Sequence, residues 1–446
     1  MLHHLHLKNV GPAPEMRLDL GPRLNLITGD NGLGKSFLLD VTWWALTRRW
    51  PHELNHRMTS GYTARPTDPK RPASIGFELT SKSGVVGYES QYSPRDEAWT
   101  GKPGRPWNPG LVIYAHADGS FSVWDPARNY WKRRGNIDVQ ERLPGYVFTP
   151  NEVWDELKVE VEGRETIVCN GLVRDWASWI REGGGLAKIM KSVLGVLSPG
   201  ESPEDRLTPG PLVRLSLDDS RDIPSLKTAY ATQVPILHAS AGVRRIVALV
   251  YMLLWSWNEH VIAARRHGEK ETSQVVMLID ELEAHLHPRW QRSILESVLR
   301  LAETFHRRAT IQLLAVTHSP LVLASAEPTF DAKQDAWFDL DLEKIGQKSQ
   351  VVLRKREFVR HGDASAWLTS EAFDLKGAGS ILAEQAIARA LELVVSEKPS
   401  AKDIQKVDDM LSAALSDTNR FWLRWSEFRK SVDPKKGARM TRRRSA

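Results

Sequence analysis

The sequence predicts an α/β fold built around a phosphate-binding loop, and three stretches of the chain support this prediction. Leu24–Thr28 is a compact apolar run that leads directly into the glycine-rich segment Gly29–Ser36. Val275–Ile279 is a second apolar run, and it ends in two acids. Ile311–Val316 is a third, and it ends in a loop that contains a histidine. Short apolar runs bounded by loop residues are typical of buried strands, so reactive side chains are expected at the strand ends.

Composition indicates a soluble protein with two or three domains. The chain has 446 residues, of which 41% are hydrophobic and 26% charged, as in ordinary globular proteins. The one cysteine, Cys169, excludes an internal disulfide framework and suits a reducing compartment. The most apolar segment, Ile246–Trp257, is shorter than the roughly 18 residues of a membrane span and predicts a buried helix. No signal-peptide pattern is visible. We therefore expect a cytoplasmic protein with no membrane contact.

The positive charge of the chain is concentrated at its end. The net charge is +6, and the segment Glu427–Ala446 alone holds eight basic and two acidic residues. A basic tail can bind phosphate backbones without sequence preference, and it can equally be a solvated end. DNA therefore remains a candidate partner of this tail.

We expect five regions along the chain. Residues 1–50 form an N-terminal lobe with the glycine loop, and residues 51–235 are an insertion that completes this domain. Residues 236–330 form a C-terminal lobe with the remaining motifs. Residues 331–430 hold a small hairpin and helices that bind a partner, and residues 431–446 are a disordered basic tail.

The insertion and the C-terminal part each carry recognisable patterns. The insertion is β-rich in its first half and helical in its second half. The whole chain has 17 tryptophans, and we expect them to serve core and interface packing. The expected strands are Ile75–Leu79, Val85–Gln91, Leu111–Ala115 and Phe121–Trp124, with a hairpin at Ala336–Asp341 and Gln350–Arg354. The expected helices are Asn170–Glu182, Leu186–Leu197, Ile381–Val395, Lys402–Leu415 and Asn419–Lys430.

The glycine-rich segment fits the pattern G-x-x-x-x-G-K-[ST] in full. Its glycines let backbone N–H groups turn toward phosphate oxygens, its lysine adds a cation, and its serine hydroxyl can complete a Mg²⁺ shell. The alternative is an ordinary glycine turn between a strand and a helix that binds no ligand. The preceding strand and following helix favour phosphate binding. The eight residues are Gly29, Asp30, Asn31, Gly32, Leu33, Gly34, Lys35 and Ser36.

The two acids at the second strand end have separate expected roles. Asp280 would hold Mg²⁺ through water, and Glu281 would act as general base on the attacking water. A buried strand that ends in carboxylates needs a compensating cation, which a metal–nucleotide pair supplies. Such a strand end is weak evidence by itself, and its weight comes from the neighbouring motifs.

Two further motifs complete the set. The third strand ends in Thr317-His318-Ser319-Pro320, where a lone histidine is often structural. The segment His238–Arg245 precedes a long apolar helix and resembles the L-S-G-G-Q signature of ABC ATPases, with Ser240 and Gly242 at the matching positions. The alternative for Ser240 is an ordinary helix N-cap. A serine at a helix N-terminus can bind a phosphate in either case.

The order of these motifs resembles that in ABC/SMC-type ATPase heads. The segment Asp280–Pro288, D-E-L-E-A-H-L-H-P, is similar to the D-E-x-E-x-H-L-H-P hallmark of bacterial AAA-domain ATPases related to the RecF and overcoming-lysogenisation-defect groups. The resemblance covers Leu2–Trp50 and Ile236–Ser325. Many proteins of this kind serve in anti-phage systems, including the ATPase subunit of Septu.

The resemblance implies an ABC-type P-loop ATPase head with an inserted β/helical subdomain and a mostly helical C-terminal region. It implies ATP and Mg²⁺ as ligands, with Ser36 and Asp280 at the metal and Glu281 and His318 at the γ-phosphate. Ser240 and Gly242 of one chain would close on the γ-phosphate of a second chain in a homodimer, with a higher oligomer left open.

Three functional hypotheses follow from the resemblance. The first is a nucleotide-dependent switch that regulates a separately encoded effector, such as a nuclease, in anti-phage defence. The second is a RecF-like DNA-binding ATPase in recombination or repair, and the third is a hydrolase with a second active site in its C-terminal part. Long SMC arms are absent from the sequence, and Asp339-Leu340-Asp341 imitates only one motif of a Toprim nuclease. The glutamine that usually reaches the metal is not identified, with Gln91 and Gln140 as candidates.

Overall fold

The structure is a computed structural model that describes residues 1–82, 84–102, 106–161, 163–198, 206–228, 231–305, 309–396 and 399–432. The chain divides into two compact units, residues 1–364 and 365–446. Each unit is described by itself.

An eight-stranded sheet forms the centre of the first unit, in the order β11-β8-β7-β17-β18-β3-β19-β20. The five strands β7, β17, β18, β3 and β19 are parallel to their neighbours in this series, and the outer pairings are antiparallel. Because parallel strands end at a common edge, the ends of β3, β17 and β18 are brought together. The bounds are β3 Leu24–Gly29, β7 Leu111–Ala115, β8 Phe121–Trp124, β11 Tyr146–Phe148, β17 Gln274–Ile279, β18 Thr310–Val316, β19 Asp335–Ile345 and β20 Lys348–Arg356.

A second sheet of five antiparallel strands covers α1 (Lys35–Thr47) from the other side. Its order is β2-β1-β4-β5-β6, and α1 contacts β4 of this sheet as well as β3, β7, β17 and β18 of the central sheet. Ten of the thirteen residues of α1 are buried, as expected for a helix enclosed on both sides. The bounds are β1 Leu2–Lys8, β2 Glu15–Asp19, β4 Ser74–Ser81, β5 Gly84–Ser93 and β6 Ala98–Trp99.

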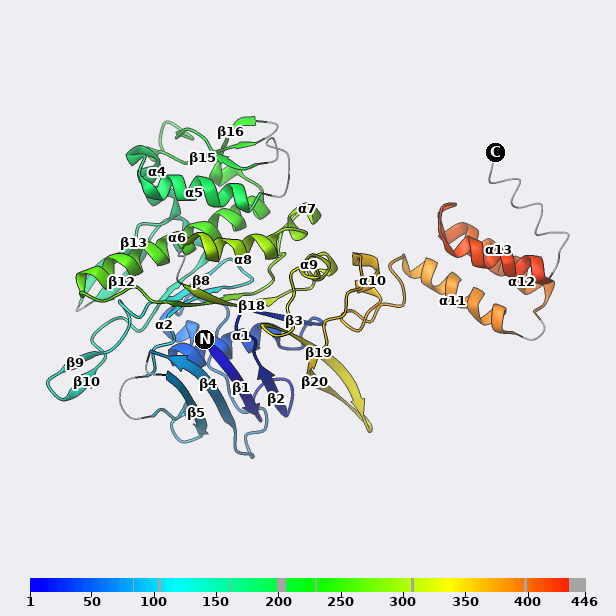
Figure 1. Cartoon of the computed structure of the whole chain (residues 1–446), viewed down its shortest axis with the longest axis horizontal. Coiled ribbons are helices and arrows are strands. Elements are labelled where there is room, and N and C mark those ends of the chain that lie inside the picture. Colours follow the sequence, from blue (N-terminus) through cyan, green and yellow to red (C-terminus); the bar gives the residue numbers. More distant parts are fainter. Residues whose placement is uncertain are drawn as a thin grey trace. The chain divides into compact units, whose positions relative to one another are not determined.

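Side chains of the parallel strands alternate between two helical layers. Tyr114 and Leu278 belong to the core that includes α1, whereas Ile113 and Met277 pack with residues of α6 and α8. Figure 1 shows α6 and α8 along one side of this sheet. Strands buried on both faces read as continuous apolar runs, which is why the sequence marks them clearly.

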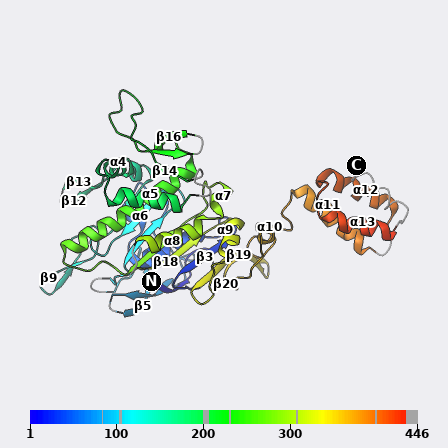
Figure 2. The ribbon, with the colours of Figure 1, turned by 45° about the horizontal axis from the view of Figure 1, so that its top comes forward.

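Further helices and small sheets complete the first unit, and α4, α5 and α8 lie beside the long helix α6 (Figure 2). The helices are α2 Pro51–Leu54, α3 Pro150–Trp154, α4 Leu172–Glu182, α5 Gly185–Val196, α6 Ala241–Arg266, α7 Pro288–Gln291, α8 Ile294–Phe305 and α9 Pro320–Ala326, with a 3₁₀ turn at Ile236–His238. Small sheets are formed by β9 Lys132–Arg134 with β10 Ile137–Val139, by β12 Leu157–Val161 with β13 Arg164–Cys169, and by β14 Thr208–Pro209 with β15 Ser225–Thr228 and β16 Ala231–Pro235.

Helix α6 is long and apolar enough to cross a membrane by length and composition alone. Within the first unit, 67% of its most apolar 18-residue stretch is buried inside the protein. The expectation that Ile246–Trp257 is a core helix is therefore confirmed.

The short helix α10 Ala364–Leu368 lies at the start of the second unit, and the described part of this unit then contains three helices packed around a small apolar core. They are α11 Ile381–Val395, α12 Ala401–Ala414 and α13 Phe421–Val432, so the three helices expected here are confirmed. Asp408 is 5% exposed, accepts a hydrogen bond from Trp425 Nε1 at 2.9 Å and pairs with Arg429 at 2.8 Å. This cluster joins α12 to α13.

The structure differs from the expected bounds of two regions. The hairpin at 336–354 was assigned to a partner-binding region that starts at residue 331, but β19 pairs with β3 and belongs to the central sheet. The apolar residues of β19 that pair with β3 are buried in the central sheet, and the local sequence pattern does not reveal this pairing. The basic tail was expected from residue 431, but α13 extends to Val432, and residues 433–446 lie outside the described part of the chain.

Candidate functional site

The glycine loop joins β3 to the first turn of α1. Gly29, Gly32 and Gly34 have φ values of 133°, 80° and 95°, in the region that favours glycine. At Gly34, a Cβ would also lie 2.6 Å from Pro12 Cγ. The loop is thus shaped for glycine at the N-terminus of a helix, where backbone N–H groups and the helix dipole attract an anion.

Lys35 lies across this loop. Its side chain is nearly buried, at 5% exposure, and its ammonium group donates to the carbonyl oxygens of Gly29 at 2.9 Å and Asp30 at 2.6 Å. Burial lowers the pKa of Lys35, and the charge of Asp280 is the largest influence in the opposite direction. The lysine at the start of α1 and the aspartate after β17, which are far apart in the sequence, therefore share one electrostatic environment.

Asp280 follows β17 and is only 3% exposed. Burial raises its pKa, and a hydrogen bond from the Ser36 side chain is the strongest effect that lowers it. Its Oδ1 is buried and has no hydrogen-bond partner in the structure. Within the described residues, no group of three or more His, Cys, Asp or Glu side chains is arranged to hold a metal.

Arg245 of α6 fixes the backbone at the end of β17. Its guanidinium donates to the carbonyl oxygens of Asp280 at 2.7 Å and Glu281 at 3.3 Å, and to that of Ala117 at 2.9 Å. Glu281 has a φ of 48°, which is uncommon for a residue with a side chain. Burial lowers the pKa of Arg245, and Asp280 and Glu281 counteract this. Local sequence pattern does not reveal this role of Arg245, because its four carbonyl acceptors, which include His116 O at 3.2 Å, come from two loops that are far apart in the sequence.

Glu283 connects the loop after β17 to the loop after β18. Its carboxylate accepts hydrogen bonds from Thr317 Oγ1 at 2.7 Å and from the backbone N–H of His318. Burial lowers the pKa of His318, and the charge of Lys35 lowers it further, whereas Glu283 and Glu281 raise it. These effects place His318 in the same neighbourhood as Lys35 and Glu281.

Ser240 and Gly242 lie at the start of α6. Ser240 is the N-cap, its Oγ accepts a hydrogen bond from Val243 N at 3.4 Å, and it is exposed. A Cβ on Gly242 would lie 2.5 Å from His285 O, so glycine permits close packing of α6 on the loop after β17. The contacts given for these two residues are within α6 and with that loop, and they do not join the glycine loop of the same chain.

Asp40, which is partly buried, and the buried Tyr114 form a pair that no motif in the sequence indicates. Asp40 lies one helical turn after Ser36, and its Oδ1 accepts a hydrogen bond from Tyr114 Oη at 3.0 Å. Burial raises the pKa of Asp40 to about 7, and the charge of Asp280 also raises it. The four-residue spacing between Ser36 and Asp40 places both side chains on one face of the helix, and this spacing could have indicated Asp40 from the sequence.

Neither candidate glutamine has a described contact with this group. Gln91 is exposed on β5, where its backbone N–H donates to Thr100 Oγ1 at 2.9 Å. Gln140 lines a separate cavity. The structure therefore gives no support to either residue at the metal position.

Comparison with known proteins places the chain in a family. The family model described as "AAA domain, putative AbiEii toxin, Type IV TA system" matches residues 24–324, which include the glycine loop, Asp280 and His318. The chain is 32% identical over 141 residues to the retron Ec83 probable ATPase of Escherichia coli, which is 31% of this chain and 22% of that protein. It is 50% identical over 84 residues to Septu protein PtuA of Bacillus mycoides (strain KBAB4), which is 19% of this chain and 10% of that protein.

The matched segments are short parts of these relatives. They span 22% of the retron Ec83 protein, 20% of the retron Vc95 probable ATPase of Vibrio cholerae serotype O1 biovar El Tor and 10% of the Septu protein. The similarity therefore concerns shared segments and not whole proteins.

Solved structures were also compared. An SMC head bound to the C-winged helix domain of ScpA matches with a TM-score of 0.42 and 13% identity, covering 79% of this chain and 98% of that one. The recombination mediator protein RecF matches with a TM-score of 0.36 and 13% identity, covering 76% and 95%. The α/β class expected from the sequence is confirmed by the central sheet itself, and with the family match over residues 24–324 the chain belongs to the AAA-domain family described above.

Proposed function

We propose that this protein binds and hydrolyses ATP and acts as a nucleotide-dependent dimeric switch. The observation that carries the proposal is the buried, unpartnered Oδ1 of Asp280 beside the Ser36 hydroxyl at the end of a glycine loop. A buried carboxylate oxygen without a partner is unfavourable, and a divalent cation would compensate it. Relatives named as probable ATPases support the same reaction.

The binding roles follow from chemistry and position. Backbone N–H groups of residues 29–36 and the ammonium of Lys35 bind the phosphates of ATP. Ser36 and Asp280 would hold Mg²⁺, which supplies charge neutralisation at the phosphates. To contact a phosphate, Lys35 exchanges its present hydrogen bonds to the carbonyls of Gly29 and Asp30 for phosphate oxygens.

Glu281 and His318 are assigned to the γ-phosphate end. Glu281 accepts the proton of the attacking water as general base, and Arg245 holds the backbone from which it projects. His318 is kept in place by Glu283. The lowered pKa of His318 favours a neutral imidazole, which can donate one hydrogen bond to the γ-phosphate.

A second copy of the chain completes the proposed site. Ser240 is exposed at the N-terminus of the 26-residue helix α6, where its hydroxyl and the helix dipole can accept a phosphate across a dimer interface. Gly242 keeps this helix end packed on the loop that bears Glu281. ATP would thus close the dimer and hydrolysis would reopen it; assembly beyond the dimer is left to experiment.

The proposed output is regulation of a separately encoded effector, such as a nuclease, in anti-phage defence in the cytoplasm. The similarity of short segments to a Septu protein and to retron ATPases supports this context. The second unit, with its own helical core, is the proposed partner-binding region. A RecF-like DNA-binding ATPase is the alternative, and the basic residues between Glu427 and Ala446 favour it.

The substitution Glu281→Gln tests the proposal directly. We expect the variant to bind ATP and to form a closed dimer, with hydrolysis reduced about 100-fold or more because the general base is lost. Phosphate release measures turnover, and light scattering measures mass with and without ATP. Glu165→Gln, at an exposed carboxylate, is the matched control.

Two results would contradict parts of the proposal separately. Unchanged turnover in Glu281→Gln would remove the general-base role. Tight ATP binding without any ATP-dependent change in mass, in a wild type that is monomeric throughout, would remove the dimeric switch. Co-purification with the product of a neighbouring gene would support the effector hypothesis. ATP-dependent DNA binding that is lost when residues 435–446 are deleted would support the RecF-like alternative.

A further inference from the structure

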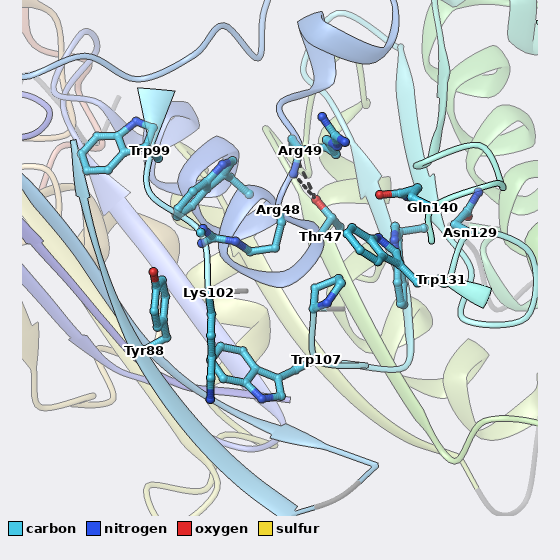
Figure 3. A pocket seen from close by; sticks show the side chains of 14 residues that line it. Thr47, Arg48, Arg49, Tyr88, Trp99, Lys102, Trp107, Asn129, Trp131 and Gln140 are labelled. Carbon is cyan, nitrogen blue, oxygen red and sulfur yellow. Dashed lines mark hydrogen bonds between the residues drawn. The ribbon is translucent and has the colours of Figure 1, made fainter. Parts of the chain in front are cut away.

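A cavity of about 310 Å³ lies at the carboxyl-terminal end of α1, and its walls also come from β5, β6 and segments near residues 107, 124–131 and 140 (Figure 3). The glycine loop is at the other end of the same helix. Lys35 and Arg48 are thirteen residues apart, so the helical rise separates them by about 20 Å. The cavity is therefore distinct from the proposed ATP site.

The lining of this cavity combines aromatic rings with positive charge. Its cations are Arg48, Arg49 and Lys102, and no carboxylate is among the described residues that line it. Aromatic faces bind other flat π systems by stacking, and a positive lining without acids attracts an anion and repels a cation. The six aromatic lining residues are Trp44, Tyr88, Trp99, Trp107, Trp124 and Trp131.

Arg48 carries unused hydrogen-bonding capacity at this wall. Its guanidinium lies over the Trp44 ring, 3.8 Å from the ring centroid, and its Nη2 donates to Thr100 O at 3.1 Å. Its Nη1 is buried and has no hydrogen-bond partner. Burial lowers the pKa of Arg48 to about 10, so the environment disfavours its charge. An anion in the cavity would compensate this cation, for which no ion pair with a carboxylate is present among the described residues.

The other two cations lie beside accessible rings. The ammonium group of Lys102 is 5.4 Å from the centroid of the partly exposed Trp107 ring. Figure 3 shows Arg49 and Gln140 near Trp131, on the other side of the cavity from Lys102 and Trp107. Both groups of side chains line the cavity.

We propose that this cavity binds a nucleobase that carries a phosphate, either as a free nucleotide or as the end of a single-stranded nucleic acid. The base stacks on tryptophan, as bases do on aromatic side chains in single-strand binding proteins. The phosphate lies near the guanidinium and ammonium groups. A volume of about 310 Å³ is at the small end of the range for ligand pockets, roughly 300–1,000 Å³, and fits one nucleotide and not a longer segment.

The test uses the full-length protein and two probes. One probe is thymidine 5′-monophosphate, followed by calorimetry, and the other is a 5′-phosphorylated hexathymidylate with a 3′ fluorophore, followed by anisotropy. Both are measured without any ATP analogue, which could itself enter the cavity, in the wild type and in Lys35→Ala. Binding that Lys35→Ala retains takes place outside the glycine loop.

The cavity variants are Trp107→Ala, Lys102→Gln and Arg48→Gln. We expect at least one probe to bind the wild type, and each substitution to weaken it about tenfold or more. Matched controls are Tyr62→Ala, at an exposed ring, and Arg265→Gln, at an exposed guanidinium; these should change affinity less than twofold. If Arg48→Gln unfolds, the other two variants carry the test.

The outcomes separate the sources of the ligand. Binding of the mononucleotide supports a free nucleotide, and binding of the oligonucleotide alone supports a strand end. The proposal is overturned if neither probe binds at millimolar concentration, or if the three cavity variants bind as the wild type does. It is also overturned if an acidic peptide without a base binds more tightly than both probes.

Discussion

The two ends of helix α1 use opposite chemistry. At its N-terminus, exposed loop residues surround a buried lysine, and a carboxylate oxygen on the neighbouring strand end has no partner. At its C-terminus, Trp44 stacks on Trp50 with ring centroids 5.5 Å apart and supports Arg48. The first end is the proposed ATP site and carries buried charge that is unfavourable without a ligand, whereas the aromatic side chains of the second end contribute to the core beside the proposed cavity site. Substitutions at the two ends should therefore have opposite consequences.

The largest effect is expected for Trp44→Ala. Trp44 is 3% exposed and contacts Trp50, Phe77 and Trp99, so its removal leaves a cavity and should lower the free energy of unfolding by about 3–5 kcal/mol. Urea denaturation measures this change. A loss below about 1 kcal/mol would show that the aromatic end of α1 is not part of the stabilising core.

Lys35→Ala should have the next largest effect, and on binding instead of stability. We expect ATP affinity to fall about 100-fold or more, because a buried charge-assisted contact to the phosphates is lost. The free energy of unfolding should change by less than about 1 kcal/mol, since Lys35 is itself unfavourably buried. Calorimetry with ATP checks the first point. Retained affinity would contradict the assignment of the glycine loop.

In the nucleotide-free protein, Asp280→Asn should change stability only slightly, and the sign of this change sharpens the comparison. Burial raises the pKa of Asp280 in the folded protein, so the native state loses stability as the pH rises above about 4, the ordinary value for aspartate. Without nucleotide, asparagine should be neutral near pH 4 and stabilise the protein by about 1 kcal/mol at pH 7. Thermal unfolding at the two pH values measures this difference.

The same variant should lose Mg²⁺-dependent ATP binding, because the amide cannot replace the carboxylate at a metal. Destabilisation of the nucleotide-free protein by Asp280→Asn at pH 7 would contradict the view that this buried carboxylate is unfavourable in the absence of a bound cation.

Local patterns predicted the elements of the nucleotide end. The strands before Gly29, Asp280 and His318 are apolar on both faces, so the sequence shows them as continuous runs. Their carboxyl ends meet because the strands are parallel neighbours. Spacing within short segments was therefore enough to identify the loop, the acids and the histidine, whereas their roles in catalysis still depend on the experiments above.

Features assembled from distant segments could not be predicted in this way. Arg245 reaches carbonyl groups more than a hundred residues away in sequence, and Glu283 fixes the loop of His318 across the sheet. The tryptophans were expected to serve packing, which holds for Trp44, but Trp107 and Trp131 line an open cavity. Nothing in the spacing of single tryptophans reveals that they converge.

The pairing of β19 with β3 determines where the protein can be cut. A shortened chain that stopped at residue 330 would leave β3 as an edge strand, and its unpaired backbone groups would invite aggregation. The smallest soluble fragment that keeps the glycine loop should therefore extend at least to Arg356, the end of β20.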